Sequence, residues 1–228
     1  MRLTARDVTL LRDIALSHTL TRDQMIALGY FNTVTRTNRR LKQLSDIGLV
    51  KRLETPFFSQ GLYSVTPKSA EILGEQIGSI VAGRTGSPRF IQHALCITNA
   101  RIRLIQRGAT TWKFEQQLRC WFRFAGNRYE IRPDGLAVID SNRHIAVEVD
   151  LGHVAPAKFE EKLYAFQAFV AAGKCQELWG VSTFRLLTLS PGKTRADNLS
   201  KLTPPKCPFE HFTTTFEEFG VPSVGAWS

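Results

Sequence analysis

The stretch from Arg132 to Lys162 constrains the fold of this chain more than any other, because two apolar runs alternate with carboxylates. Asp134 precedes the first apolar run, and Glu148 and Asp150 end the second. Turn residues separate the runs, and a helical pattern that carries Lys162 follows them. If the runs pair as a hairpin, a strand–turn–strand–helix unit brings Asp134 close to the end of the second strand.

This arrangement predicts a divalent metal site with Asp134, Glu148 and Asp150 as ligands. Alternate residues of a strand share a face, so Glu148 and Asp150 are expected to point the same way. Carboxylate oxygens are hard ligands that suit Mg²⁺ or Mn²⁺, and a cation would relieve their mutual repulsion. Lys162 is expected at the edge of the helix's apolar stripe, where it can stabilise negative charge on a phosphate.

Simpler interpretations stay open on the residues alone. Pro-Asp-Gly is a common turn sequence, so the role of Asp134 can be confined to shaping a β-turn. Glu148 and Asp150 can be solvated strand residues, and Lys162 can extend its ammonium group to solvent from an apolar stem. The stretch therefore predicts a metal-capable site without deciding between a catalytic and a structural role.

The first eighty residues predict a winged helix-turn-helix. Thr4 and Thr21 are the expected N-caps of two short helices. A third helix is predicted from about Thr33 to Ile47 and should end at Gly48 in a left-handed conformation. Two β-rich runs around a loop with proline and glycine then predict the wing. This order of elements is typical of proteins that bind DNA.

The polar face of the third helix carries the residue types that bind DNA. Arginine and glutamine make bidentate contacts with base edges in the major groove, and arginine and lysine hold phosphates. A solvated helix face is the simpler alternative, but the position on the third helix favours double-stranded DNA. The buried face is predicted to contain Val34, Thr37, Leu41 and Leu44. The predicted DNA-binding residues are Asn32, Thr35, Arg36, Arg39, Arg40, Lys42 and Gln43.

The charge balance supports a polyanionic partner, since the formal net charge is +10. No basic amphipathic helix is evident, which favours nucleic acid over a membrane surface. The four cysteines are scattered without a Cys-x-x-Cys pair, so we expect reduced thiols. Because no signal peptide or bilayer-spanning apolar run is present, a cytoplasmic location is expected.

The loop of the predicted wing contains Phe57 and Phe58 but no lysine or arginine. We interpret the two phenylalanines as a packing surface against the second domain or another subunit. A homodimer that uses the wing is a hypothesis that follows from this interpretation.

The rest of the chain predicts an α/β domain with a central mixed sheet, so the protein is α/β in class and α+β overall. A small, polar segment ending in Pro88 predicts a linker. The expected domains are a winged helix at residues 1–80, a linker at 81–88 and an α/β domain at 89–228. Strands are expected at residues 112–124, 129–140, 144–150, 175–183 and 184–190, with a last strand within 208–220.

Pro133-Asp134, a strand ending in Glu148-x-Asp150 and a helical lysine resemble, in this order, a divergent PD-(D/E)XK nuclease-like domain. With the N-terminal winged helix, the chain is similar to the replication-relaxation family and to MobC-type plasmid mobilisation relaxases. The resemblance covers most of the chain in short motifs. Its other matching pieces are His93 and Asn99 before the sheet, Glu115 before the first acidic strand, and the segment 184–199.

The resemblance implies a role for each matching residue. Asp134 and Glu148 would be metal ligands, and Asp150 a further ligand or an orienting group. Lys162 would stabilise charge, and Glu115 would complete the acidic cluster. In these nucleases the usual lysine lies two residues after the second acid, where this chain has Asp150. Lys162 looks like a lysine that has migrated to the helix, and this departure bears on catalytic competence.

The resemblance implies metal-dependent cleavage of one DNA strand, which relaxes supercoiled plasmid or mobile-element DNA during conjugation, mobilisation or replication. Other mobilisation or replication proteins would then be partners. The nucleophile would be water or a tyrosine; we interpret Tyr129 as a strand-packing aromatic. The alternative function is a catalytically silent, sequence-specific DNA-binding regulator that uses the nuclease-like domain for dimerisation.

Overall fold

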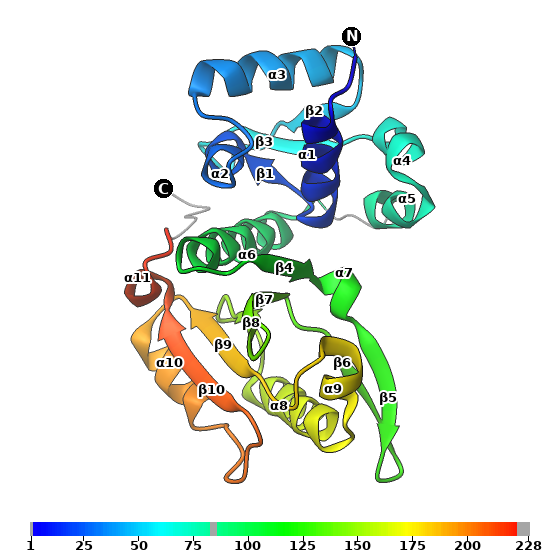
Figure 1. Ribbon diagram of the computed structural model, residues 1–228. Coiled ribbons are helices and arrows are strands. Elements are labelled where there is room, and N and C mark those ends of the chain that lie inside the picture. Colours follow the sequence, from blue (N-terminus) through cyan, green and yellow to red (C-terminus); the bar gives the residue numbers. More distant parts are fainter. Residues whose placement is uncertain (1, 83–85, 223–228) are drawn as a thin grey trace. The chain divides into compact units, whose positions relative to one another are not determined.

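The computed structural model describes residues 2–82 and 86–222 of the chain. They divide into two compact units, residues 2–102 and residues 103–222 (Figure 1). Helices and three sheets alternate along the chain, which confirms a mixed α/β class. Within the described residues no helix is both long and apolar enough to cross a membrane.

The first unit has the element order of a winged helix-turn-helix. Three helices surround a small antiparallel sheet in which the strand order is β1-β3-β2. Thr4 and Thr21 are N-caps with capping boxes, and Gly48 has a φ of +74°, as the sequence predicts. The elements are α1 (Ala5–Leu16), β1 (Leu20–Thr21), α2 (Arg22–Ala27), α3 (Val34–Asp46), β2 (Val50–Leu53), β3 (Leu62–Val65), α4 (Pro67–Leu73) and α5 (Glu75–Ala82).

The two units divide within a long helix, α6 (Pro88–Gln106), and therefore later than the predicted linker at residues 81–88. Residues 83–85 of that linker lie outside the described residues. Most of α6, up to Ile102, belongs to the first unit, because its side chains form hydrogen bonds, ion pairs and apolar contacts with that unit. The Gln24 amide donates to the Asn99 side chain at 2.7 Å, and Arg101 Nη1 lies 2.6 Å from a carboxylate oxygen of Asp13.

The wing also contacts α6. Ile91 and Leu95 of this helix form an apolar cluster with Leu62 of β3, and Phe58 of the wing loop packs against that cluster. Phe57 is 37% exposed. Phe58 is therefore a packing residue within one chain, and the wing-mediated homodimer stays a hypothesis that concerns Phe57.

The second unit contains a five-stranded mixed sheet in the order β10-β9-β8-β7-β4 and a separate β5–β6 ribbon. Strands β8, β9 and β10 are parallel neighbours, and β4, β7 and β8 are antiparallel. The strands are β4 (Thr111–Phe114), β5 (Cys120–Phe124), β6 (Asn127–Ile131), β7 (Gly135–Asp140), β8 (Arg143–Val149), β9 (Arg185–Ser190) and β10 (Glu210–Thr215). The helices are α7 (Glu115–Leu118), α8 (Pro156–Ala171), α9 (Lys174–Trp179), α10 (Lys193–Ser200) and α11 (Phe216–Phe219).

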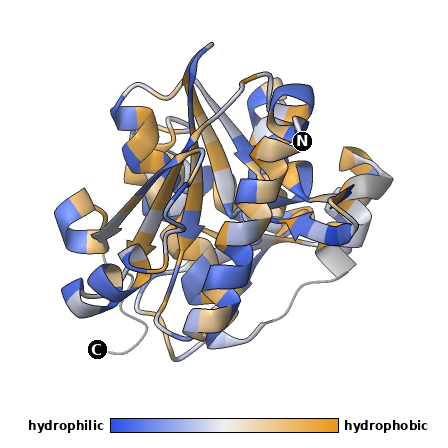
Figure 2. Cartoon of the chain, turned by 90° about the horizontal axis from the view of Figure 1, so that it is seen from below, coloured by the Kyte–Doolittle hydropathy of each residue, from blue (hydrophilic) through white to orange (hydrophobic). Residues whose placement is uncertain are grey.

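Helices α8 and α10 share one hydrophobic core with the sheet. Leu136, Ala146 and Leu186 are direct cross-strand neighbours on one sheet face, and Phe166 and Leu199 pack in the same cluster from the two helices. Helix α8 leads from β8 to its parallel neighbour β9, which a strand pair of this kind requires. Figure 2 shows hydrophobic colour on the strands and on one side of the helices around them.

Two predicted strands are interrupted. Residues 112–124 form β4, the helical turn α7 and β5, because the Gln117 side chain caps the backbone N–H of Phe114 at 2.9 Å and Leu118 is buried. Residues 129–140 likewise divide at Pro133 into β6 of the ribbon and β7 of the large sheet. A pattern of apolar residues alone does not show which sheet a strand joins.

The predicted strand at residues 175–183 is wrong, since α9 occupies most of it. Cys175 and Trp179 are four residues apart and both buried, which matches one helical face. Gly173 and Gly180, both left-handed, lie at the two ends of the helix. The apolar residues were compatible with either period over such a short segment.

Candidate functional site

Helix α3 presents one face to the core and the other to solvent. Thr37, Leu41 and Leu44 are buried, as predicted, and hold the helix against α1 and the sheet. Val34, predicted to be buried, is 45% exposed because it lies in the first turn, ahead of the core. Thr33 caps the helix by accepting from the Arg36 N–H at 3.3 Å. The cap fixes where the outward face begins.

The outward face of α3 borders an open hollow of about 460 Å³, which we call the α3 hollow. Asn32, Thr35, Arg36, Arg39 and Lys42 are exposed, so five of the seven predicted DNA-binding residues are accessible. Four arginines are among the hollow's lining residues, together with Tyr30, Phe31 and the α2–α3 turn. The hollow is lined by Thr4, Arg6, Gly29, Tyr30, Phe31, Asn32, Arg36, Arg39, Arg40 and Gln43.

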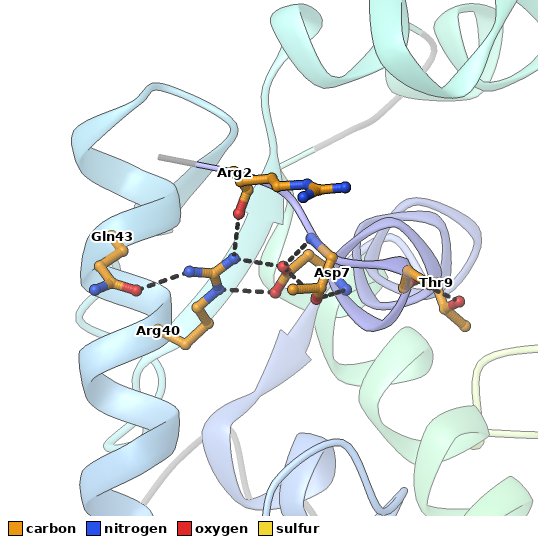
Figure 3. A network of polar contacts seen from close by, with 7 residues as sticks. Arg2, Asp7, Thr9, Arg40 and Gln43 are labelled. Atoms are coloured by element: carbon orange, nitrogen blue, oxygen red, sulfur yellow. Dashed lines mark hydrogen bonds and ion pairs between the residues drawn. The ribbon is translucent and has the colours of Figure 1, made fainter.

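Arg40 differs from the other arginines of α3, because its guanidinium is bound to Asp7 (Figure 3). Arg40 Nε donates to Asp7 at 2.8 Å and Nη2 donates to the other carboxylate oxygen. A further bond at 2.9 Å joins Arg40 to the Gln43 side chain. The structure thus places two predicted DNA contacts, Arg40 and Gln43, in an internal network at one edge of the α3 hollow.

Asp7 is completely buried and has a strongly shifted pKa. Burial alone would raise the pKa of Asp7, but hydrogen bonds from Arg40 and from Thr4 lower it to about 2. The same carboxylate receives the Thr4 N–H at 2.7 Å within the capping box of α1. The pair therefore ties the start of α1 to the second turn of α3.

In the second unit, Asp134 lies directly before β7 and is bonded to β8. Its N–H donates to the Val147 carbonyl at 3.0 Å, and its carboxylate accepts the Val149 N–H at 2.7 Å. Gly135 pairs with Val147, so Asp134 continues the antiparallel ladder opposite Glu148. This confirms that the two runs form a hairpin that brings Asp134 to the end of the second strand. Asp134 is bonded to the neighbouring strand through both its backbone and its carboxylate, so its role is not confined to shaping a turn.

Gly135 is required at the start of β7 because the Trp112 ring covers it. A Cβ atom at Gly135 would lie 2.0 Å from the ring of Trp112, which is on the neighbouring strand β4. The indole ring thus fixes the backbone directly beside Asp134. The glycine of this Pro-Asp-Gly sequence is therefore needed for packing against Trp112, which the frequent use of the sequence in turns does not suggest.

Glu148 is buried at the end of β8 and bound by Lys162 of α8. Burial lowers the pKa of Lys162, but the charges of Glu148 and Asp134 outweigh it and raise that pKa above the ordinary value. The Lys162 side chain keeps 33% of its surface exposed. Lys162 therefore lies beside the acidic end of β8, as the sequence predicts. Its side chain is also partly open to solvent there.

Asp150 is held apart from this arrangement by an arginine that the sequence interpretation missed. Arg195 of α10 donates to the two Asp150 carboxylate oxygens at 2.7 and 3.1 Å and to the Val154 carbonyl at 2.6 Å. No group of three His, Cys, Asp or Glu side chains that could hold a metal occurs among the described residues. The predicted set of three carboxylate ligands is therefore not formed.

Glu115 lies near the same strand end and is bound by Arg132. The charge of Glu115 also acts on Lys162, and that of Asp134 acts on Arg132, so these side chains influence one another. We call Glu115, Arg132, Asp134, Glu148 and Lys162 the acidic cluster. It contains three carboxylates and two cations, and therefore one net negative charge when all are ionised.

Two residues with contacts to the predicted site were not assigned from the sequence. Arg132 begins the acidic stretch, and its position two residues before Asp134 is the signal that could have indicated it. Arg195 lies in the segment 184–199, which the resemblance included without giving it a role. Only the packing of α10 against the sheet shows that Arg195 reaches Asp150.

The sequence of this chain matches the model of one protein family over most of its length. The sequence model described as replication-relaxation matches residues 11–183, about three quarters of the chain. The chain belongs to the replication-relaxation family. The match begins within α1, so it includes most of the winged helix and the whole acidic cluster of this family member. No curated protein matches the sequence.

Two solved structures resemble the replication-relaxation chain weakly. A mutant of MarR from E. coli has 20% sequence identity and a TM-score of 0.29, with 46% of this chain and 76% of that chain covered. Protein VC1899 from Vibrio cholerae has 11% identity and a TM-score of 0.36, with 96% of this chain and 55% of that chain covered. These scores are too low to assign either fold to the chain.

Proposed function

We propose that this replication-relaxation family protein binds double-stranded DNA through the outward face of α3. The supporting observation is that Arg36 and Arg39 are exposed on the α3 hollow, which Arg6 also lines. Guanidinium groups bind phosphates and the O6 and N7 atoms of guanine, and Asn32 offers an amide for adenine. The net charge of +10 would add attraction for DNA of any sequence.

Arg40 has a supporting role in this proposal. Its ion pair with Asp7 holds α3 on α1, so Arg36 and Arg39 lie on a fixed surface and lose little freedom on binding. Lys42 pairs with Asp46 on the exposed surface at 3.2 Å, which leaves it open to exchange Asp46 for a phosphate. We therefore assign DNA contacts to Asn32, Thr35, Arg36, Arg39 and Lys42, and positioning roles to Arg40 and Gln43.

We further propose that the second unit nicks one strand of the DNA and so relaxes it. Asp134 and Glu148 would hold a hard cation, since they lie opposite each other at the start of β7 and the end of β8, in a cluster with net negative charge. Bound there, Mg²⁺ or Mn²⁺ would act as a Lewis acid toward a phosphoryl group. Lys162 would place its ammonium beside the scissile phosphate, and Arg132 would fix the position of the Glu115 carboxylate. Asp150 would orient the loop after β8 through Arg195.

The DNA served would belong to a plasmid or another mobile element, as in MobC-type mobilisation relaxases of the PD-(D/E)XK kind. Replication or mobilisation proteins would then act with it on the same site. The packing of Tyr129, whose ring stacks on Phe122 at 5.6 Å, favours water over this tyrosine as the nucleophile.

A second candidate function is a DNA-binding regulator without catalysis. The fixed Asp150–Arg195 pair favours it, because one predicted metal ligand is already neutralised by a guanidinium. The second unit would then serve in dimerisation or in binding another protein.

DNA binding is tested by fluorescence anisotropy with labelled plasmid fragments over a range of salt concentrations. Replacing Arg36 and Arg39 with alanine should weaken binding and lower the salt slope by about one unit for each phosphate that no longer has an arginine partner. The matched control is Arg12→Ala with Arg89→Ala, which removes two exposed arginines outside the α3 hollow. Equal decreases in affinity for both double variants would contradict the assignment to α3.

Nicking is tested by relaxation of supercoiled plasmid with Mg²⁺ or Mn²⁺, comparing the wild type with Asp134→Ala, Glu148→Ala and Lys162→Ala. Each should lower the rate by at least about a hundredfold while DNA binding persists. The control is Glu161→Ala, because Glu161 is exposed on the same helix beside Lys162. Wild-type protein that binds DNA without nicking it would support the regulator instead.

A further inference from the structure

The β5–β6 ribbon of the second unit has two chemically different faces. Phe122 and Ile131 are buried on its inner face, and Phe122 packs edge-on against Phe169 of α8 at 5.8 Å. Figure 1 shows the ribbon as an arm along this unit, with its turn at the free end. The turn has positive φ at Ala125 and Gly126, which allows a tight reversal. The arm is therefore anchored by one face and presents the other to solvent.

The outer face is basic and aromatic. Alternation along the strands places Trp121 and Arg123 of β5 on the same side as Arg128 and Glu130 of β6. Arg119 and Arg132 flank the ribbon and pair with Glu130 and Glu115. Arginines thus predominate on a surface that the sequence interpretation treated only as strands.

Arg123 and Arg128 face each other directly across the two strands. Like charges in this position destabilise a ribbon, so the fold gains nothing from the pair. Within the part of the chain that the structure describes, neither guanidinium has an ion pair with a carboxylate. Two neighbouring exposed cations without acidic partners favour an anion supplied by another molecule.

Trp121 adds a flat group to these charges. Half of its surface is exposed, and the Arg128 guanidinium lies over the ring, 4.4 Å from its centroid. The stacking holds Arg128 near the middle of the ribbon's outer face. An exposed indole between arginines suits a ligand that alternates phosphates with flat rings, and single-stranded nucleic acid has this chemistry.

We infer that the outer face of the β5–β6 ribbon binds single-stranded DNA, with Arg123 and Arg128 on consecutive phosphates and Trp121 against a base. A DNA duplex keeps its base faces stacked inside, so the exposed indole favours an unpaired strand. The inference goes beyond the proposed function, because it requires neither the α3 hollow nor the acidic cluster.

The test measures anisotropy of fluorescein-labelled oligothymidine with the full chain. Arg123→Ala with Arg128→Ala should weaken binding about tenfold and reduce the salt slope by about 1.4, since each single-strand phosphate contributes about 0.7. Trp121→Ala should cost roughly tenfold, and Trp121→Phe should retain most of the affinity. The charge-matched control, Lys201→Ala with Lys206→Ala, removes two exposed cations elsewhere on the same unit and should have little effect.

Three results would overturn the inference. Oligothymidine could bind the ribbon double variant as tightly as the wild type, or the lysine control could lose as much affinity. Alternatively, the ribbon variant could weaken binding of a DNA duplex as strongly as that of the single strand. Arg36→Ala with Arg39→Ala should leave oligothymidine binding intact while weakening duplex binding, so the α3 proposal and the ribbon inference can fail separately.

Discussion

The two units each contain a buried carboxylate that is bound by a cation from a helix, and the two pairs differ in how completely they are enclosed. Asp7 is fully buried, receives two bonds from Arg40, and also caps α1. Glu148 is also buried, but its partner Lys162 is one-third exposed and binds it through a single ammonium group. The first pair is closed, and the second keeps one side open to solvent.

This difference separates a structural pair from a candidate reactive one. A planar guanidinium with two bonds gains geometric specificity, whereas an ammonium on a flexible stem can change partners. An ion pair that must receive a phosphate needs an accessible cation, and Lys162 meets that condition. Position in the sequence would suggest that Arg40 is the DNA contact, yet its enclosure assigns it to the fold.

The largest expected effect comes from removing Arg40. Arg40→Met leaves the buried Asp7 carboxylate without its cation and should lower the free energy of unfolding by about 3–5 kcal/mol. Urea denaturation measures the decrease, with Lys42→Met as the control, since Lys42 is on the same helix in an exposed pair worth at most about 0.5 kcal/mol. Equal decreases in the two variants would show that the Asp7 pair is not a structural one.

Acid should weaken the first pair. The folded-state pKa of Asp7 is about 2 and its ordinary value is 3.8, so its contribution is present above pH 3.8 and is lost as the pH falls toward 2. The decrease in stability is about 2.5 kcal/mol, and denaturation of wild type and Asp7→Asn across this range measures it. A wild type whose stability changes with pH no more than that of Asp7→Asn would contradict the shift.

The stability of the second unit should fall when Gly135, which lies opposite the strand end that carries the Glu148–Lys162 pair, is replaced. Gly135→Ala places a methyl group inside the Trp112 ring and should cost about 1–3 kcal/mol, because the indole or the strand must move. Combining it with Trp112→Leu should restore part of the stability, measured by thermal denaturation. Additive effects of the two substitutions would mean that the ring does not determine the need for glycine.

The smallest expected effect concerns alkali and the second pair. Burial opposes the charge of Lys162, but Glu148 and Asp134 raise its pKa above 10.5, so its contribution is present below pH 10.5 and is lost at higher pH. Glu148→Gln should reduce this alkaline destabilisation, while Glu161→Gln on the exposed surface should not. Unfolding curves of the three proteins at rising pH measure it, and identical alkaline slopes would contradict the coupling.

Much of the fold could be predicted because its signals are local. Thr4, Thr21 and Gly48 act on the backbone within a few residues, and they fix the helix ends of the first unit wherever the rest of the chain lies. The alternation around Glu148 similarly fixes a strand and its hairpin. The prediction failed at helix α9 because six residues are too short to distinguish a helical from a strand period.

The candidate site could be predicted only in part. The hairpin register follows from the turn between two apolar runs, so Asp134 beside Glu148 was within reach of the sequence. The partner of Asp150 was not, because Arg195 is 45 residues away and belongs to a helix that reaches it only through the core. The ion pair of Arg40 in α3 could not be predicted either, because its partner Asp7 lies 33 residues earlier in the chain.

The sequence by itself thus determined the winged helix, the acidic hairpin and the helix that carries Lys162, because capping, period and turn chemistry act over short distances. Only the tertiary structure decided which charged groups are already neutralised. Electrostatic pairing depends on distance in space and on burial, and neither is a property of neighbouring residues. For this reason Arg40 and Asp150 belong to the framework, whereas Arg36 and Arg39 are exposed on α3 and Lys162 keeps one third of its side chain open to solvent beside Glu148.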